Sequence, residues 1–485
     1  MGLDETFQNG SSSVGRSVVD DDNLGWHAEP GKDREEFVDE GSDGLSLVED
    51  RYDYRDRADR CHGSILPVRV GCPTIMASHE PSRPPLISWE AARQVVLGAA
   101  RALPEERVDL VDADGRVLAH DILAPEDLPS FANSAMDGFA VRAEDLAGGP
   151  RTLPLIAPVR AGDPPVVLAA GHSVSISTGA PLPAGADAIV PLEEATWSAQ
   201  TVDLPGPVAQ GRFVRVAGSD ITRGAMAIAA GTVVGAPEGG LLAALGISTL
   251  AVHRRAVVAV LATGSELVPP AQQPGAGQIR ESNATSIAWA CRRYGASVRM
   301  LGIARDEPDV LRRAIEEGLT TDLLITSGGV SVGERDLVRR TLADLGAQEH
   351  FWGIALRPGK PCAFATLGET AILGLPGNPA STLVGLALFA APFIRALAGD
   401  RDPVRGEERA IAAGPWPEVI ERDQAVRCRV EHDGDELRAT VIGDQSSHRI
   451  TSLVGTRALA MVPGGTSVSP GDRVRLLRDP WGYAT

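Results

Sequence analysis

The sequence predicts a multidomain protein of the α/β plus β class, in which a central three-layer α/β domain has small β-rich domains before and after it. Three observations predict this class. A chain of 485 residues is too long for a single hydrophobic core. Between about 256 and 400, apolar strands alternate with helix-like segments, as in a mostly parallel sheet. On either side of that region, apolar runs are short and separated by Gly and Pro.

The N-terminal segment differs in composition from the remainder of the chain. Residues 1–75 hold 17 acidic and 8 basic residues, so −9 of the net charge of −18 lies there. The segment is rich in Asp, Gly, Ser and Arg and has little apolar periodicity, so we assign residues 1–80 to an acidic disordered extension. Met76 begins a more ordinary sequence. The residues alone leave open whether 1–75 is a genuine part of the protein.

Composition argues against several classes of protein. No run of about 18 apolar residues is present, which argues against a membrane span, and the acidic N-terminus lacks the apolar stretch of a signal peptide. The acidic balance argues against nonspecific nucleic-acid binding. The five cysteines are dispersed without a C-x-x-C pair, which argues against a disulfide framework or a structural zinc site: Cys61, Cys72, Cys291, Cys362 and Cys428. We expect a cytoplasmic protein.

Before residue 256, the expected elements are one helix and then short strands. Residues 88–103 have a helical pattern, with Ser88 as a plausible N-cap and Glu90 in the first turn. Between about 120 and 255, short apolar runs separated by Pro and Gly indicate a β-rich region. Examples of these strands are Val166–Leu168, Ser173–Ile176 and Ala188–Val190.

From residue 256 onward, strands alternate with helices. Ala256–Ala262 is continuously apolar, as expected for a strand buried on both faces. Further strands are expected at 297–304, 322–325 and Ala371–Leu375, and helices at 284–294, after Pro308, at 335–345 and from Ala380. Ligands of such a sheet gather at the carboxyl ends of its strands. After about 403, short strands return and predict a separate small β domain.

A glycine-rich loop follows the strand at 322–325. Small residues let the backbone approach a ligand closely, and the loop N–H groups together with the next helix N-terminus suit an anion or phosphate. Asp336 places a carboxylate beside this loop. The alternative interpretation is an ordinary turn whose Asp starts a helix. The loop residues concerned are Ser327, Gly328, Gly329 and Ser331.

Charged residues recur where the predicted strands end. Glu266, Asp306 and Asp336 each follow a strand, and Arg357 and Lys360 precede the strand near 372. Singly, each has a structural explanation: a solvated loop acid, a helix cap, or a surface charge. Their joint placement favours a site, because the carboxyl ends of parallel strands meet at one edge. Carboxylates about 4 Å apart repel by roughly 1–4 kcal/mol, so a cluster needs a cation. Oxygen ligands beside phosphate donors favour Mg²⁺ over zinc.

Two further motifs lie in the β-rich region. Asp137 precedes Gly138 in S-A-M-D-G-F-A, and Thr178 precedes Gly179 in S-T-G-A-P-L-P-A-G-A-D-A. Taken alone, both are ordinary turn sequences, and no spacing rule makes them catalytic.

These motifs together resemble those of the molybdopterin molybdenumtransferases, the MoeA type, also found as the E domain of fusions such as gephyrin. The resemblance covers about residues 84–480. It is carried by seven motifs in family order: the two above, T-G-S-E-L, S-N-A, T-S-G-G-V-S-V-G-E-R-D, R-P-G-K-P and G-L-P-G-N-P-A-S. One such motif is weak evidence, whereas seven in order are strong evidence.

The resemblance implies four domains and a homodimer with an active site between subunits. Residues 84–135 and 214–255 correspond to an elongated, discontinuous linking domain that surrounds a small β-rich domain at 136–213. Residues 256–400 correspond to the α/β molybdopterin-binding domain, and 403–485 to a C-terminal β domain. Other cofactor-biosynthesis proteins and acceptor molybdoenzymes are implied as partners, with no nucleic acid or membrane.

The resemblance also implies an activity, in which molybdenum from molybdate enters adenylylated molybdopterin, AMP is released and Mg²⁺ is required. It implies catalytic roles for Asp137, Asp306, Asp336 and Glu266, of which Asp306, Asp336 and Glu266 are metal ligands. Arg215 and Asp220 match a motif that reaches the site from the partner subunit, and Lys360 with Pro361 matches the molybdate-binding element. The implied substrate-binding residues are Thr178, Arg215, Asp220, Asn283, Ser327, Gly328, Gly329, Ser331, Arg357, Lys360, Pro361, Pro376, Pro379 and Ser447.

The sequence departs from the family pattern at two positions. A lysine common in bacterial members is Gly353 here, and another is Arg357, which keeps the charge but not the geometry. Two alternative functions are weighed against the enzyme: a scaffold of the gephyrin type, and a CinA-like nucleotide pyrophosphatase. The pyrophosphatase is not expected to carry the motifs around Asp137 and Thr178. A scaffold would tolerate loss of Asp137, Asp306 and Asp336.

Overall fold

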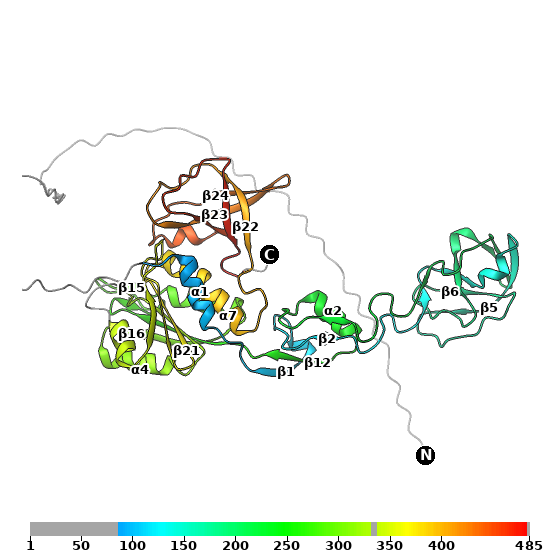
Figure 1. Cartoon of the computed structure of the whole chain (residues 1–485), viewed down its shortest axis with the longest axis horizontal. Coiled ribbons are helices and arrows are strands. Elements are labelled where there is room, and N and C mark those ends of the chain that lie inside the picture. Colours follow the sequence, from blue (N-terminus) through cyan, green and yellow to red (C-terminus); the bar gives the residue numbers. More distant parts are fainter. Residues whose placement is uncertain (1–85, 331–336, 483–485) are drawn as a thin grey trace, which may run out of the picture. The chain divides into compact units, whose positions relative to one another are not determined.

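The computed structural model describes residues 86–330 and 337–482 (Figure 1). Within these ranges the chain forms three six-stranded sheets and several two-stranded ones. Two residues that the sequence places at the site, Ser331 and Asp336, lie outside the described residues.

The central sheet has the strand order β16-β13-β17-β21-β20-β18. The first four strands are mutually parallel, and β20 and β18 extend the sheet in antiparallel fashion. The four parallel strands lie close to the predicted positions, whereas the antiparallel strands β18 and β20 were not predicted from the sequence. Their bounds are β13 Val257–Thr263, β16 Ser297–Ala304, β17 Leu323–Ser327, β18 Gln348–Trp352, β20 Ala363–Leu367 and β21 Thr370–Leu375.

Helices cover both faces of this sheet, which makes three layers. Alternate residues of β13 separate the two interfaces, because side chains along a strand point to opposite faces. Val258 and Val260 pack in the cluster that contains α1, α3, α6 and α7, whereas Ala259 and Leu261 pack with α4 and α5. Figure 1 shows α1 and α7 close together. The helices are α1 Trp89–Ala99, α3 Asn283–Arg293, α4 Pro308–Gly318, α5 Leu337–Asp344, α6 Pro379–Gly385 and α7 Ala391–Leu397.

Local sequence explains how these helices start. The Ser88 hydroxyl accepts a hydrogen bond from the Ala91 N–H at 3.1 Å, as the predicted N-cap of α1. The helix ends at Ala99, before the expected 103, because Ala100 adopts an extended conformation. Pro308 and Pro379 occupy the first positions of α4 and α6, where a missing N–H costs nothing.

A second six-stranded sheet, β7-β4-β6-β5-β9-β8, lies between residues 138 and 204. The expected strand Val166–Leu168 is wrong, because Val167 forms only an isolated bridge with Ala184. The expected strands at 173 and 188 are present as β6 and β7. The bounds are β4 Gly138–Val141, β5 Arg151–Val159, β6 Ser173–Ile176, β7 Ala188–Pro191, β8 Thr196–Trp197 and β9 Thr201–Leu204.

Short antiparallel pairs join the segments that flank this sheet. Residues 105–134 pair with residues 214–253 in three two-stranded ladders. These strands are β1 Glu105–Asp109 with β12 Thr249–His253, β2 Ile122–Leu123 with β11 Met226–Ile228, and β3 Asn133–Ser134 with β10 Val214–Arg215. Helix α2 spans Ala236–Ala244. Short helical turns are η1 Leu110–Asp112, η2 Ala143–Leu146, η3 Leu192–Glu194, η4 Leu386–Ala390 and η5 Ile450–Leu453.

The C-terminal sheet has the order β19-β23-β24-β22-β26-β25. Its first strand, β19, comes from the segment before β20, so the central region contributes an edge strand to this sheet. Strands β14 Leu267–Val268 and β15 Ile279–Arg280 form a separate two-stranded parallel sheet outside the C-terminal sheet. The sheet strands are β19 Leu356–Arg357, β22 Glu407–Ala413, β23 Asp423–Asp433, β24 Glu436–Val441, β25 Ala458–Val462 and β26 Arg473–Arg478. The expected fold class, a multidomain α/β plus β protein, is confirmed.

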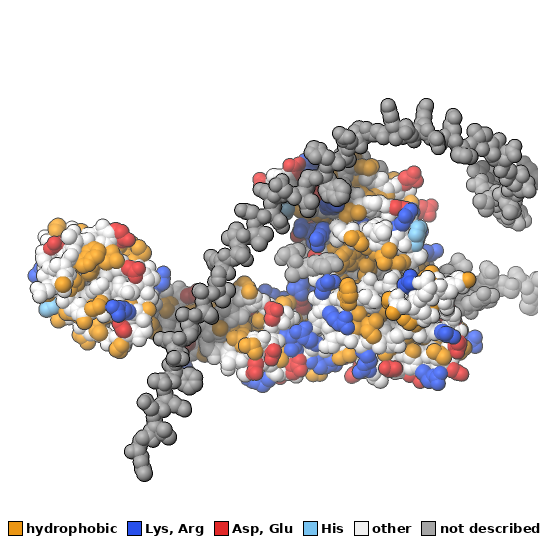
Figure 2. All heavy atoms as spheres, turned by 180° about the vertical axis from the view of Figure 1, so that it is seen from behind, with side chains coloured by type: hydrophobic (Ala, Val, Ile, Leu, Met, Phe, Trp, Pro, Cys, Tyr) orange, Lys and Arg blue, Asp and Glu red, His pale blue; other side chains and the backbone are white. Residues whose placement is uncertain are grey.

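Among the described residues, one helical run has the length and hydropathy of a membrane span. It covers Pro379–Leu397, through α6, η4 and α7, and has a mean hydropathy of 1.7. However, 83% of that stretch is buried inside the protein, as in a core helix. Acidic and basic side chains are interspersed on the face drawn in Figure 2, so no single-sign field dominates that face.

Candidate active site

A cavity of about 840 Å³ opens at the carboxyl ends of the parallel strands. It is lined by the residues that follow β13, β16, β17 and β21, together with the start of α3 and the 360–361 segment. Two of the three carboxylates and one of the two cations that the sequence predicts to converge therefore meet in one place: Glu266, Asp306 and Lys360. The predicted residues that line it are Glu266, Asn283, Asp306, Ser327, Gly328, Gly329, Lys360, Pro361, Pro376 and Pro379.

Two carboxylates come from neighbouring strand ends. The Asp306 N–H donates to the Ser265 hydroxyl at 3.0 Å, and the Ser265 N–H donates to Asp306 Oδ2 at 3.2 Å. This reciprocal pair fixes the turn after β16 against the turn after β13. Glu266 folds back over Gly264, since a Cβ on Gly264 would lie 2.5 Å from Glu266 Oε2. Both carboxylates are exposed to solvent and line the cavity.

The glycine-rich loop needs its glycines for packing. Gly328 and Gly329 have φ angles of 92° and 64°. A Cβ on Gly328 would lie 2.5 Å from the Thr263 carbonyl oxygen, and one on Gly329 would lie 2.3 Å from Val338 Cγ2. The Gly328 N–H donates to the Leu375 carbonyl at 3.0 Å, so this amide is occupied and does not serve the predicted anion cradle.

Asn283 ties three loops together at the cavity. Its Nδ2 donates to Ser327 Oγ at 2.9 Å and to the Gly377 carbonyl at 2.7 Å. The adjacent Glu281 accepts the Ala284 N–H at 2.6 Å and so caps the start of α3. The side chain that the family resemblance assigns to substrate binding therefore also holds the cavity wall in place.

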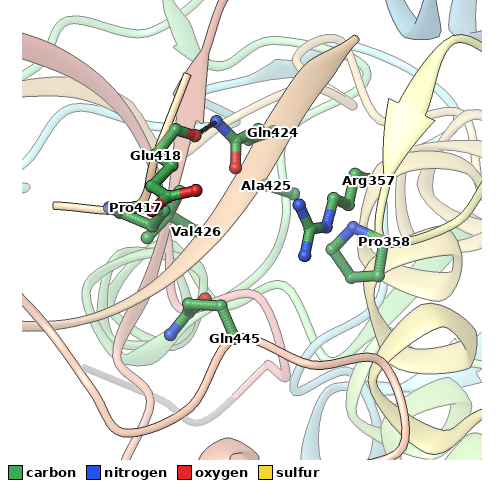
Figure 3. A pocket seen from close by; sticks show the side chains of 8 residues that line it. All are labelled: Arg357, Pro358, Pro417, Glu418, Gln424, Ala425, Val426 and Gln445. Atoms are coloured by element: carbon green, nitrogen blue, oxygen red, sulfur yellow. Dashed lines mark hydrogen bonds between the residues drawn. The ribbon is translucent and has the colours of Figure 1, made fainter. Parts of the chain in front are cut away.

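The two predicted cations face different cavities. Lys360 lines the large cavity, and no described residue forms an ion pair or hydrogen bond with its ammonium group. Arg357 instead lines a separate cavity of about 230 Å³. Figure 3 shows its guanidinium extending toward residues of the C-terminal domain, such as Gln424 of β23 and Gln445 in the loop after β24. Backbone pairing of Arg357 with Gln424 explains this direction, because β19 belongs to the C-terminal sheet.

A loop of the C-terminal domain reaches the cavity as well. The Asn378 Nδ2 donates to Ser447 Oγ at 3.2 Å, and the Ala380 N–H donates to the Ser447 carbonyl at 3.0 Å. Ser447 is thus held against the start of α6, and the next residue, His448, lines the cavity. Sequence reasoning did not select His448, because no second histidine stands at a metal-ligand spacing from it.

A buried cation, which was not predicted from the sequence, contacts the backbone of this loop. Arg427 is fully buried, and its Nη2 donates to the carbonyls of Asp444 and Ser446 at 3.0 and 3.3 Å. Its Nε and Nη1 have no partner among the described residues. Burial lowers the pKa of this guanidinium to about 10. The sequence feature that could have indicated this buried cation is the position of Arg427 between the apolar residues Val426 and Cys428 of β23.

Besides Arg357 and Ser447, four more predicted residues do not line this cavity. Asp137 and Thr178 contact each other, since Asp137 Oδ1 accepts the Thr178 N–H at 2.6 Å and the hydroxyl at 3.1 Å. Arg215 pairs with Asn133 through β10 and β3, and the Asp220 N–H donates to the Leu128 carbonyl at 2.9 Å. All four belong to the segments before β13.

The predicted three-carboxylate metal cluster is only partly visible, because Asp336 lies outside the described residues. Within residues 86–330 and 337–482, no group of three His, Cys, Asp or Glu side chains has the geometry to hold a metal ion. The departure at Gly353 has a structural reason. Its φ is 111° and a Cβ would lie 2.9 Å from Leu86 Cδ2, so a lysine there would be strained.

Comparison with known proteins finds matches to three regions of the chain. Family models match residues 87–246 as the MoeA N-terminal region, 259–396 as a probable molybdopterin binding domain, and 409–478 as the MoeA C-terminal region. A molybdopterin molybdenumtransferase from Synechococcus elongatus is 34% identical over 78% of this chain and 96% of its own length. Molybdopterin molybdenumtransferase 2 from Mycobacterium tuberculosis is 35% identical over 78% and 95%. The crystal structure of the molybdopterin biosynthesis MoeA protein from Pyrococcus horikosii superposes with a TM-score of 0.69 at 30% identity, covering 81% of this chain and 99% of that one.

Proposed function

This chain belongs to the MoeA family of molybdopterin molybdenumtransferases, enzymes of molybdenum cofactor biosynthesis, and from that premise we propose that it inserts molybdenum from molybdate into adenylylated molybdopterin with release of AMP. The observation that carries the proposal is the cavity at the carboxyl ends of the central strands. It combines Glu266 and Asp306 with the ammonium group of Lys360, a mixture suited to a polyanionic substrate that is bound with a metal.

The residues present fit a Mg²⁺ ion shared with the substrate. Mg²⁺ is usually held by one or two carboxylates together with substrate phosphates and water. Glu266 and Asp306 supply two carboxylates, and Asp306 Oδ1 is not engaged by Ser265. Asp336 is the third candidate ligand from the sequence. Bound there, Mg²⁺ would offset charge on the anhydride oxygens of the adenylylated pterin and on the departing phosphate.

Lys360 is the proposed contact for molybdate. Molybdate is a tetrahedral dianion, and the chain carries a net charge of −18, so binding requires local positive charge. Lys360 lies between Gly359 and Pro361 in a segment where Pro358 and Pro361 restrict the backbone. Its carbonyl accepts the Ile354 N–H at 2.8 Å, which anchors the segment further. Arg357, directed into the smaller cavity, is not expected to share this contact.

We further propose that the protein acts as a cytoplasmic homodimer. Asp137, Thr178, Arg215 and Asp220 lie on segments that do not line the cavity, which suits residues that complete the site of a partner subunit. In that arrangement each site draws the carboxylates of the central domain from one subunit and the Asp137–Thr178 pair from the other. The finished cofactor would then pass to acceptor molybdoenzymes.

The deciding experiment measures AMP. Purified full-length chain is mixed with adenylylated molybdopterin, molybdate and Mg²⁺, and AMP release is followed together with molybdenum bound to pterin. We expect both products to form, and each to be lost without molybdate or with EDTA. Asp306→Asn should lose activity, whereas Asp309→Asn, on the exposed first turn of the following helix, should not. A chain that binds the pterin but never releases AMP would contradict the proposal.

A scaffold role is the alternative function. It predicts that the protein binds a macromolecular partner equally well after loss of Asp137 or Asp306. The AMP measurement separates the two, because a scaffold has no need for the strand-end carboxylates.

A further inference from the structure

The C-terminal domain contributes one imidazole to the large cavity. His448 is exposed and follows Ser447, whose hydroxyl and carbonyl are held by Asn378 and Ala380 at the start of α6. His448 is the only histidine among the described residues that line this cavity. Its position is therefore set by a contact between two domains and not by the fold of either one alone.

The loop that carries His448 is also held by hydrogen bonds within the C-terminal domain. Arg427 donates to the carbonyls of Asp444 and Ser446, and the Gln445 Nε2 donates to the Ile442 carbonyl at 2.7 Å. The Gln445 Oε1 in turn accepts the Arg427 N–H at 2.8 Å. Backbone groups on both sides of the loop are thus bonded, so the ring of His448 is presented from an anchored backbone.

Charges on the same loop are already paired. Asp444 Oδ1 accepts the Ser446 hydroxyl, and its Oδ2 lies 3.2 Å from the Arg449 Nε. The bonds from Ser446 first, and then the Arg449 charge, lower the pKa of Asp444. Asp444 and Arg449 therefore have partners other than His448.

The lining of the cavity holds more carboxylates than basic side chains, so a polyanionic substrate requires a further cationic or hydrogen-bond-donating group there. Three carboxylates, those of Glu266, Glu281 and Asp306, line the cavity with two basic side chains, Arg280 and Lys360. Arg280 is engaged locally, since its Nε donates to the Pro270 carbonyl at 3.0 Å and its Nη2 to Gln273 Oε1 at 3.1 Å. A substrate with several phosphate oxygens would meet only Lys360 as an unengaged cation among the described lining residues.

An imidazole suits this place. Each ring nitrogen can donate to a phosphate oxygen, and a protonated ring adds positive charge to that hydrogen bond. We propose that His448 is a substrate-binding residue, supplied by the C-terminal domain, that donates a hydrogen bond to an anionic phosphate oxygen of the adenylylated pterin. This inference rests on the proposed function and deepens it, because it names a residue of the C-terminal domain that binds the substrate in the cavity.

The test measures binding without turnover. The full chain is titrated with adenylylated molybdopterin in the presence of Mg²⁺ and without molybdate, so that no turnover occurs, and the dissociation constant is determined for wild type, His448→Ala and His448→Arg. His432→Ala is the matched control, because His432 is an exposed histidine of the same domain on β23 that does not line the cavity. Melting temperatures are recorded for all variants.

We expect His448→Ala to raise the dissociation constant about tenfold or more, the range for one lost charge-assisted hydrogen bond. His448→Arg, which keeps a cationic donor, should remain close to wild type, and so should His432→Ala. Equal affinity of His448→Ala and His432→Ala would overturn the inference, and so would an equal loss in His448→Ala and His448→Arg, since the contact would then not depend on a donor. Failure of the wild type to bind the pterin would instead overturn the proposed function itself.

Discussion

Asp137 and Thr178 are 41 residues apart in the sequence, yet one carboxylate oxygen of Asp137 accepts hydrogen bonds from both the amide and the hydroxyl of Thr178, at 2.6 and 3.1 Å. Each residue precedes a glycine in a turn, and the two turns meet because β4 and β6 are neighbours in one sheet. A carboxylate held in this way keeps one oxygen outside the pair. The arrangement therefore fixes a carboxylate oxygen that does not belong to the lining of the large cavity.

The first prediction tests whether that group serves a partner subunit. Asp137→Asn and Asp306→Asn are each expected to abolish AMP release as pure proteins. If every site combines the two residues from different subunits, mixed dimers regain activity, because one of their two sites keeps both aspartates. AMP release is measured after the two variants are unfolded and refolded together. Refolded mixtures that stay inactive, while wild type recovers, would contradict a site shared in this way.

The second prediction concerns the metal. Asp306→Asn should raise the Mg²⁺ concentration needed for half-maximal binding of the adenylylated pterin by about tenfold or more, since a charged ligand is lost while the shape is kept. The measurement is a Mg²⁺ titration of pterin binding, with Asp309→Asn as the control. A Mg²⁺ requirement equal to that of the control would remove Asp306 from the metal site.

The third prediction concerns Lys360. Lys360→Ala is expected to raise the half-saturating molybdate concentration by about ten- to a hundredfold, the effect of losing one charge-assisted hydrogen bond. Affinity for the adenylylated pterin should change little. Molybdate is titrated while AMP is measured, and pterin binding is determined separately. Arg357→Ala is the matched control, since its side chain lines the other cavity. A loss confined to pterin affinity would move Lys360 to the phosphate end of the site.

The fourth prediction concerns stability and pH. Burial alone would raise the pKa of Asp322, but two hydrogen bonds from Arg254, at 2.6 and 2.7 Å, and one from the Val257 N–H outweigh it and hold the pKa below its usual value. Asp322 precedes β17 and ties it to the start of β13. Because Arg254 is partly exposed, we expect Asp322→Asn to cost about 1–2 kcal/mol at neutral pH.

The sign of the pH dependence follows from the lowered pKa. The stabilising contribution of Asp322 is present above the pKa of an unfolded aspartate, about 4, and is lost as the pH falls through the lower folded value. The difference in urea midpoint between wild type and Asp322→Asn should therefore shrink in acid. Asp435→Asn, in the turn between β23 and β24, is the control and should leave the midpoint unchanged. A difference that grows in acid would contradict the assignment.

The position of the large cavity could be predicted from the sequence for a simple reason. A strand such as β13, which is apolar from Val257 to Ala262, is buried on both faces, and crossover helices between such strands make them parallel. Residues that follow parallel strands then lie at one edge. Glu266 and Asp306 were selected on that basis, and the structure brings them to one cavity together with Lys360, which precedes β20. The antiparallel strands β18 and β20 were not predicted, because β18 has only two apolar residues, Phe351 and Trp352, and the short run of β20 carries no signal of direction.

The sequence by itself thus determined the fold class, the family and the edge of the central sheet at which charged residues gather, because these depend on local periodicity and on motifs that are continuous in the chain. Only the tertiary structure decided which distant groups meet. Arg357 and Lys360 are separated by two residues but face different cavities, since Arg357 joins the C-terminal sheet beside Gln424. The contact of Asn378 with Ser447, and with it the place of His448, likewise depends on the packing of one domain against another, which no spacing within the sequence records.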